Sequence, residues 1–122
     1  MSVQKKWNLL EAAILLDNYI KHINGKISRK EAIQKSSLEL RSMAQRLGYE
    51  IDDIYRNING ITFQMHSMES AYKGYTLLKP ASKLCAEMVQ IYKQDKGRFI
   101  KILKEARRMI MTETNQNNFI NN

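Results

Sequence analysis

The sequence predicts an all-α protein, a compact bundle of about six or seven short helices, from three observations. Apolar residues recur at three- and four-residue spacing along most of the chain, which is typical of amphipathic helices. Capping residues precede several of these runs, and no segment alternates apolar and polar residues over a strand length. At 122 residues and 43% hydrophobic content, the chain can bury one core. We expect a helical module over residues 1–111 and a disordered tail or linker over residues 112–122.

The first predicted helices begin at capping residues. Three pairs have the spacing of a capping box: Asn8 with Glu11, Ser28 with Glu31, and Ser36 with Glu39. We therefore expect a first helix that ends near Asn24, a short helix after Ser28, and a separate helix from Ser36 to Leu47.

Residues 40–64 carry the densest run of specific signals. The helix through Met43 is expected to end at Gly48, because glycine adopts positive φ easily, and a second short helix is expected near Asp52. A small residue, a turn glycine and two apolar residues have helix-turn-helix spacing: Ala44, Gly48, Ile51 and Ile54. An ordinary helical hairpin explains the same residues, and Asp52 puts negative charge where a phosphate-binding helix would begin.

Arg56, Asn57 and Asn59 precede an apolar helical stripe that is expected to begin at Gly60. The unsatisfied N–H groups of that helix start, with Arg56 and Asn57 beside them, could hold a phosphate. The same residues could instead cap helices and tie the loop to its neighbours, and we favour capping for Asn57.

The rest of the chain is expected to contain two further helices. Residues 72–80 are interpreted as a loop because glycine and Pro80 interrupt the helical period. Ser82 and Asp95 are placed to begin the last two helices. Cys85 lies on the apolar face of the first of these, as a buried residue rather than a disulfide partner.

The formal net charge of +8 is concentrated in one half of the chain. The first 72 residues hold ten basic and eight acidic residues, whereas residues 73–108 hold ten basic and three acidic residues. A basic half favours a polyanionic partner through counterion release. A solvated helix surface rich in lysine is the alternative interpretation.

Several kinds of chemistry have no motif in this sequence. His22 and His66 have no partner at metal-ligand spacing, and there is neither a glycine-rich phosphate loop nor a nucleophile elbow. We therefore expect no enzymatic activity, no metal and no cofactor. No segment is apolar enough to span a membrane, and the N-terminus lacks a signal-peptide core, so we expect a cytoplasmic protein.

Taken together, these motifs resemble an N-terminal helical module associated with bacterial HNH-type endonucleases and related restriction and phage-defence proteins. The matching residues are Trp7, Glu11 and Tyr19 in the first helix, then Tyr55, Arg56, Asn57, Asn59, Gly60 and Ile61, and later Tyr72, Gly74, Lys83, Leu84 and Tyr92. The chain departs from that pattern at Ile58, where the family often has proline, and it lacks the nuclease domain. The resemblance implies an accessory module that engages DNA rather than one that cleaves it.

We predict a non-catalytic DNA-binding or DNA-positioning module, with duplex DNA and a nuclease domain or partner protein as its partners. The residues expected to contact phosphates are Arg41, Arg46, Arg56, Lys73 and Lys83, and those expected to reach base edges are Asn57, Asn59 and Gln64. The alternative is a protein-interaction or oligomerisation module, because seven methionines suit adaptable apolar contacts. An RNA-binding protein or a transcriptional regulator is a third possibility.

Overall fold

The computed structural model describes the backbone of residues 6–74 and 81–121, and the side chains of residues 6–74 and 81–110. Five helices follow one another: α1 (Leu9–Ile23), α2 (Arg29–Arg46), α3 (Ile58–Lys73), α4 (Lys83–Gln94) and α5 (Lys96–Asn121). These described ranges contain no strand, so the all-α prediction is confirmed. The predicted number of six or seven helices is wrong.

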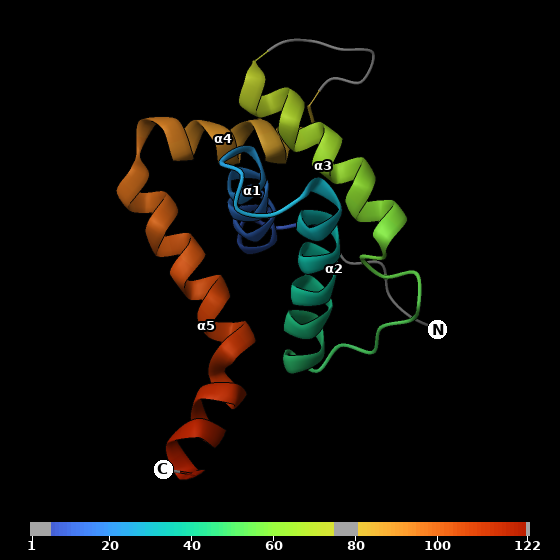
Figure 1. Cartoon of the computed structure of the whole chain (residues 1–122), viewed down its shortest axis with the longest axis vertical. Helices are drawn as coiled ribbons and strands as arrows, with labels where there is room; N and C mark the ends of the chain where they lie inside the picture. The colour runs from blue at the N-terminus through green and yellow to red at the C-terminus, as the bar shows by residue number, and fades with distance from the viewer. Residues whose placement is uncertain (1–5, 75–80, 122) are drawn as a thin grey trace.

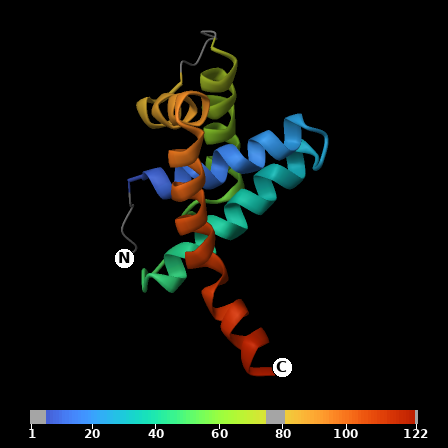
Figure 2. The same ribbon diagram turned by 90° about the vertical axis from the view of Figure 1, so that its left-hand side faces the viewer.

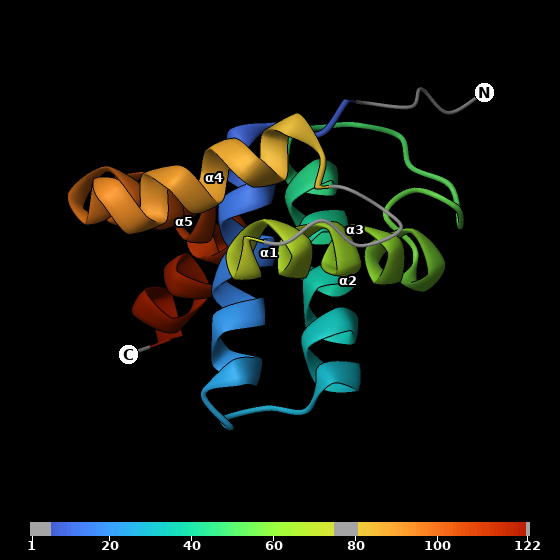
Figure 3. The same ribbon diagram turned by 90° about the horizontal axis from the view of Figure 1, so that it is seen from above.

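Helix α1 is the centre of the bundle and contacts each of the other four helices (Figure 1). Helices α1 and α2 lie side by side, and α3 crosses them (Figure 3). Helix α5 packs across α1 and α2 on another side, where it lies in front of them in Figure 2. Because α1 is covered on several sides, residues 11–16 of this helix are all buried.

The core is built from the apolar stripes that the sequence predicts. Its largest fully buried apolar side chains include Leu15, Leu16, Tyr19, Leu40, Ile61, Met65, Met68 and Met88. Cys85 is buried and has no disulfide partner, as expected. Four of the chain's seven methionines, namely Met43, Met65, Met68 and Met88, are buried in this core, so they serve packing rather than an exposed contact.

Residues 29–46 form one helix, which corrects the prediction of separate helices after Ser28 and Ser36. Ser28 and Glu31 do form the expected capping box. Ser36 is buried in the middle of α2, where its hydroxyl donates to the Ala32 carbonyl at 2.8 Å and accepts from Asn18 Nδ2 at 2.9 Å. The serine thus serves the packing of α1 against α2, and it does not begin a helix.

The connection between α2 and α3 also differs from the prediction. Gly48 ends α2 with φ +85°, as expected, but residues 49–57 contain no helix. Asp52 Oδ1 accepts from the backbone N–H groups of Ile54 and Tyr55 and closes a turn there. A helix-turn-helix joins its helices through three or four residues, so this longer connection rules out the predicted helix-turn-helix at Asp52.

The caps of the remaining helices agree with the sequence. Asn57 caps α3, Ser82 caps α4, and Asp95 Oδ1 accepts from the N–H of Arg98 in the first turn of α5. Helix α3 therefore begins at Ile58, two residues before the predicted start at Gly60. It ends at Lys73, and Gly74 is its C-cap with φ +73°. Residues 75–80 of the predicted loop lie outside the described residues. Helix α5 is traced to Asn121, and the interpretation of residues 112–122 as a tail or linker stays a prediction.

Within the described residues, no helix combines the length and apolar composition needed to cross a membrane.

Tyr19 carries a buried hydroxyl that has no hydrogen-bond partner among the described residues. Its ring packs edge-on against Tyr72, with centroids 5.5 Å apart. Burial, reinforced by the negative charge of Glu69, raises the pKa of Tyr19 to about 12.

Candidate nucleic-acid interface

Arg56, the central residue of the predicted interface, forms a buried ion pair with Glu11. Arg56 Nε lies 2.7 Å from Glu11 Oε2, and its NH2 group lies 3.1 Å from Oε1. The two residues are only 7% and 4% exposed. The guanidinium carbon also lies 4.5 Å from the ring centroids of both Trp7 and Tyr55. A planar guanidinium suits both the bidentate pair and the ring contacts, so arginine is specifically required here.

The backbone around Arg56 is held as firmly as its side chain. Arg56 has φ +47°, in the left-handed region that residues other than glycine seldom adopt. Its carbonyl accepts a 2.7 Å hydrogen bond from Ser37 Oγ of α2. Arg41, also on α2, donates to the carbonyls of Asp52 and Tyr55. These bonds attach the loop of residues 49–57 to α2 and keep Arg56 in its strained conformation.

Arg41 and Arg56 therefore have internal roles, which the sequence interpretation kept open for Arg56 and did not foresee for Arg41. Both were expected to contact phosphates, but their guanidinium groups bind a carboxylate or carbonyls of the chain itself. The available signal was the combination of Trp7, Glu11 and Tyr55, since an acid and two aromatic rings form the environment that a buried arginine needs.

Asn57 has the capping role that we favoured. Its side-chain oxygen accepts from the N–H of Gly60 at 2.9 Å, in the first turn of α3. Asn59 is exposed in the same turn, and Gln64 is half-buried one turn further on. The structure thus brings three predicted base-contacting residues to one end of α3.

The remaining predicted residues do not join that group. Arg46 is exposed in the last turn of α2. Lys73 is the last residue of α3, about 24 Å along the helix from Asn57, and its Nζ lies 3.6 Å from Glu69 Oε2. Lys83 is exposed at the start of α4. The predicted site is therefore divided between two ends of the bundle.

The exposed side of α5 carries a basic stripe that we call the α5 basic face: Arg98, Lys101, Lys104 and Arg108. Their spacing of three or four residues places them on one side of the helix, over about 15 Å of its length. The side chains of Arg98, Lys101 and Lys104 make no hydrogen bond or ion pair with another described side chain. Arg108 pairs with Glu105, an exposed acidic residue three positions before it in α5.

Arg107 lies one position away and has a different role. Its guanidinium binds Asp17 on α1 at 2.7 Å and also Glu39 on α2. Because Arg107 is turned inward, it holds α5 against both helices. Helix α5, which carries the α5 basic face, is thereby fixed against the bundle on the side that faces the viewer in Figure 2.

The described residues contain no group of three or more histidine, cysteine, aspartate or glutamate side chains that could hold a metal ion. Comparison of the chain with known protein families, with curated proteins and with solved structures gives no match.

Proposed function

We propose that this protein is a non-catalytic helical module that binds nucleic acid, with duplex DNA as its main partner, through the α5 basic face. The observation that carries the proposal is the exposure of Arg98, Lys101 and Lys104 on one side of one helix. Phosphate contacts of this kind release counterions and supply most of the affinity of sequence-independent binding. A single helix that presents basic side chains also matches the width of the DNA major groove.

Helix α3 is a second element of the proposed interface. Asn59 is exposed and Gln64 is partly exposed near its N-terminus, so both keep amide groups available for base edges. Asn57 and Arg56 do not belong to this set, because their side chains are engaged within the fold. The described residues of α3 and α5 make no contact with each other, so the proposal assigns the two helices separate parts of the nucleic acid.

The biological setting of the proposal comes from the resemblance of the sequence motifs. We place the module in the cytoplasm, beside a nuclease domain or partner protein of a restriction or phage-defence system. In that setting it would position DNA for another protein and would need neither a cofactor nor catalytic residues of its own.

Fluorescence anisotropy with three probes of equal length tests this function: duplex DNA, single-stranded DNA and duplex RNA. We expect duplex DNA to bind most tightly and its affinity to fall steeply between 50 and 200 mM salt. Tighter binding of single-stranded DNA or of duplex RNA would show that this class of nucleic acid is the main partner instead. No binding to any probe at low salt would contradict the proposal.

A second candidate function, a protein-interaction module, is favoured by one observation. Leu38 of α2 and Ile54 of the loop are 68% and 66% exposed. They lie in the same region, because Ser37 and Arg41 bind the backbone of residues 52–56. Light scattering over a concentration series, repeated with Leu38→Lys, tests whether this surface joins two copies of the chain. A constant monomer mass would exclude self-association there.

A further inference from the structure

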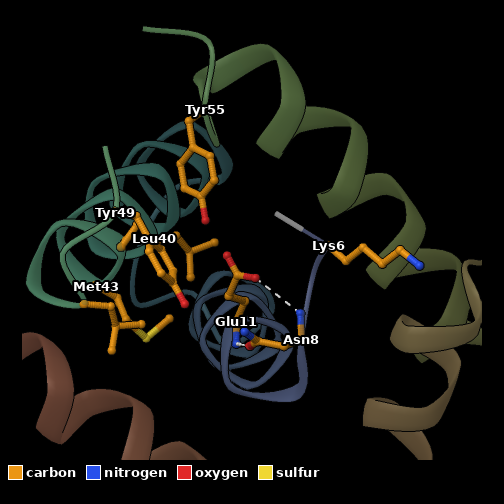
Figure 4. A pocket seen from close by; sticks show the side chains of 9 residues that line it. Lys6, Asn8, Glu11, Leu40, Met43, Tyr49 and Tyr55 are labelled. Atoms are coloured by element: carbon orange, nitrogen blue, oxygen red, sulfur yellow. Dashed lines mark hydrogen bonds between the residues drawn. The ribbon is translucent and has the colours of Figure 1, made fainter. Parts of the chain in front are cut away.

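A pocket of about 230 Å³ lies between the start of α1, the second half of α2 and the loop of residues 49–55 (Figure 4). Helix α2 supplies its apolar wall through Leu40, Met43, Ala44 and Leu47. Pockets for drug-sized ligands usually measure about 300 to 1,000 Å³. This pocket therefore has room for one small ring system.

Two tyrosines give the pocket an aromatic character. The rings of Tyr49 and Tyr55 both point into it, from either end of the loop (Figure 4). Aromatic rings contact another flat ring by stacking on its face or by meeting it edge-on. Aliphatic and thioether groups also pack well against the face of such a ring. The shape and lining thus favour a planar ligand over a branched aliphatic one.

The inner end of the pocket is polar. The Tyr55 hydroxyl points toward the Glu11 carboxylate (Figure 4), and it makes no hydrogen bond with another described residue. Tyr55 as a whole is only 5% exposed, but its hydroxyl is not among the buried atoms that lack a partner, so this group is open to a ligand in the pocket. Burial raises the pKa of Tyr55, as does the Glu11 charge, while Arg56 lowers it. The phenol consequently stays protonated at neutral pH and can donate or accept a hydrogen bond.

The Glu11 carboxylate adds a fixed acceptor beside that hydroxyl. It already accepts from Asn8 N–H and from two nitrogens of Arg56, which occupy three of its roughly four acceptor positions. Arg56 matches this negative charge, and the amine of Lys6, another lining residue, points away from the pocket (Figure 4), so a charged ligand would bring an uncompensated charge into it. An uncharged ring whose edge offers an N–H group next to an acceptor atom fits both groups.

We propose that this pocket binds a nucleobase, a planar uncharged ring that has donor and acceptor atoms on one edge. The base can come from a free nucleoside or from a nucleotide turned out of a nucleic acid. In proteins that extrude a base, the base is held between aromatic or apolar side chains and recognised by hydrogen bonds to its edge. The second source rests on the DNA binding proposed above, whereas the first does not.

Titration of the full chain with each common free nucleoside, followed in ¹H–¹⁵N NMR spectra, tests the pocket directly. We expect shifts at Tyr49, Ala44 and Tyr55, and a dissociation constant on the order of 0.1–1 mM for a ligand this small. Tyr55→Phe removes only the hydroxyl and should weaken binding about 3- to 10-fold. Ala44→Met fills the pocket and should abolish binding.

Tyr72→Phe is the matched control, because Tyr72 packs against Tyr19 and does not line the pocket. It removes the same atom and should leave nucleoside binding unchanged. Thermal unfolding of each variant shows whether it folds, and Tyr55→Phe remains informative if Ala44→Met does not fold. Equal nucleoside binding by the wild type and Tyr55→Phe would overturn the assignment, as would no binding by any nucleoside.

A DNA duplex with a central 2-aminopurine separates the two sources. A fluorescence rise with the wild type that is absent with Ala44→Met assigns the pocket to an extruded base. Nucleoside binding without such a rise assigns it to a free nucleoside. Failure of the duplex to bind at all would contradict the proposed function. The nucleoside titration would still show whether the pocket binds a nucleobase.

Discussion

Glu11 in the first turn of α1 and Arg56 in the loop before α3 form a buried bidentate ion pair across 45 residues of sequence. Trp7 and Tyr55 place their rings against the same guanidinium. Side chains from the start of α1 and from the loop before α3 therefore meet at one point inside the fold. Their joint role is to fix the loop of residues 49–57 on α1 and α2.

Breaking this pair should destabilise the protein strongly. We expect Arg56→Ala to lower the free energy of unfolding by about 3 to 5 kcal/mol, because Glu11 would remain as a buried unpaired charge. Urea denaturation measures the change. Arg98→Ala, on the exposed face of α5, should stay within about 0.5 kcal/mol of the wild type. A loss below about 1 kcal/mol in Arg56→Ala would mean that the pair does not hold the loop.

Replacing both partners should cost less than removing one. The double variant Glu11→Leu with Arg56→Met leaves no buried charge behind, so we expect it to be more stable than Arg56→Ala. Urea denaturation of the three proteins gives the order directly. If the double variant is the least stable of them, apolar side chains do not replace the pair adequately.

The raised pKa of Tyr19 predicts a loss of stability at high pH. Its pKa is about 12 in the folded state and 10.0 in the reference state, so the unfolded chain loses this proton first as pH rises. Stability from this group is complete below pH 10 and should fall by roughly 2 kcal/mol between pH 10 and 12. Denaturation of the wild type and Tyr19→Phe across that range isolates the effect, since phenylalanine cannot ionise. If the stability of the wild type and of Tyr19→Phe changed equally with pH, the predicted contribution of Tyr19 would be contradicted.

Asn57 should matter for stability and not for nucleic-acid binding. Asn57→Ala removes the cap of α3 and should cost about 1 kcal/mol, whereas Asn57→Ser should retain most of the stability. Thermal unfolding measures the first effect and DNA anisotropy the second. A folded Asn57→Ser variant with strongly reduced DNA affinity would show that the amide contacts a base.

Arg107 should hold α5 in place. Arg107→Ala removes the contacts with Asp17 and Glu39, and the three side chains are only 15–20% exposed. We expect a loss of about 2 kcal/mol and faster amide hydrogen exchange in α5 than in α3. Arg108→Ala, whose partner Glu105 is on the same exposed surface, is the control and should change stability by less than about 0.5 kcal/mol. Equal effects of the two substitutions would refute this role.

Much of the fold could be predicted because the relevant signals are local. The capping pairs at Asn8 and Ser28 and the helix end at Gly48 each depend on residues within one turn. The helix predictions were wrong where a residue distant in sequence determines the local structure. Ser36 has the spacing of a cap, yet its bond with Asn18 on α1 makes it a packing residue inside a longer helix.

The internal bonds of Arg41 and Arg56 could not be predicted for the same physical reason. Arginine next to asparagine and glycine suggests a phosphate site, but the sequence alone does not show that Glu11 reaches Arg56. The charge excess after residue 72 agrees with the exposure of Lys101 and Lys104 on α5, because exposed lysines need no tertiary partner. The sequence does not distinguish Arg107 from its exposed neighbours. Only the positions of Asp17 and Glu39 in the structure show that Arg107 forms ion pairs with α1 and α2.

The most direct test of the proposed interface compares two double variants of equal charge. Lys101→Ala with Lys104→Ala alters the α5 basic face, and Lys26→Ala with Lys30→Ala removes two exposed lysines elsewhere. Anisotropy titrations with duplex DNA at 50 and 200 mM salt measure affinity and its salt dependence. We expect the α5 variant to bind about 10-fold more weakly at low salt, with the salt slope reduced by about 2, and the other variant to bind like the wild type. Equal losses in both variants, or no loss in the α5 variant, would contradict an interface on α5.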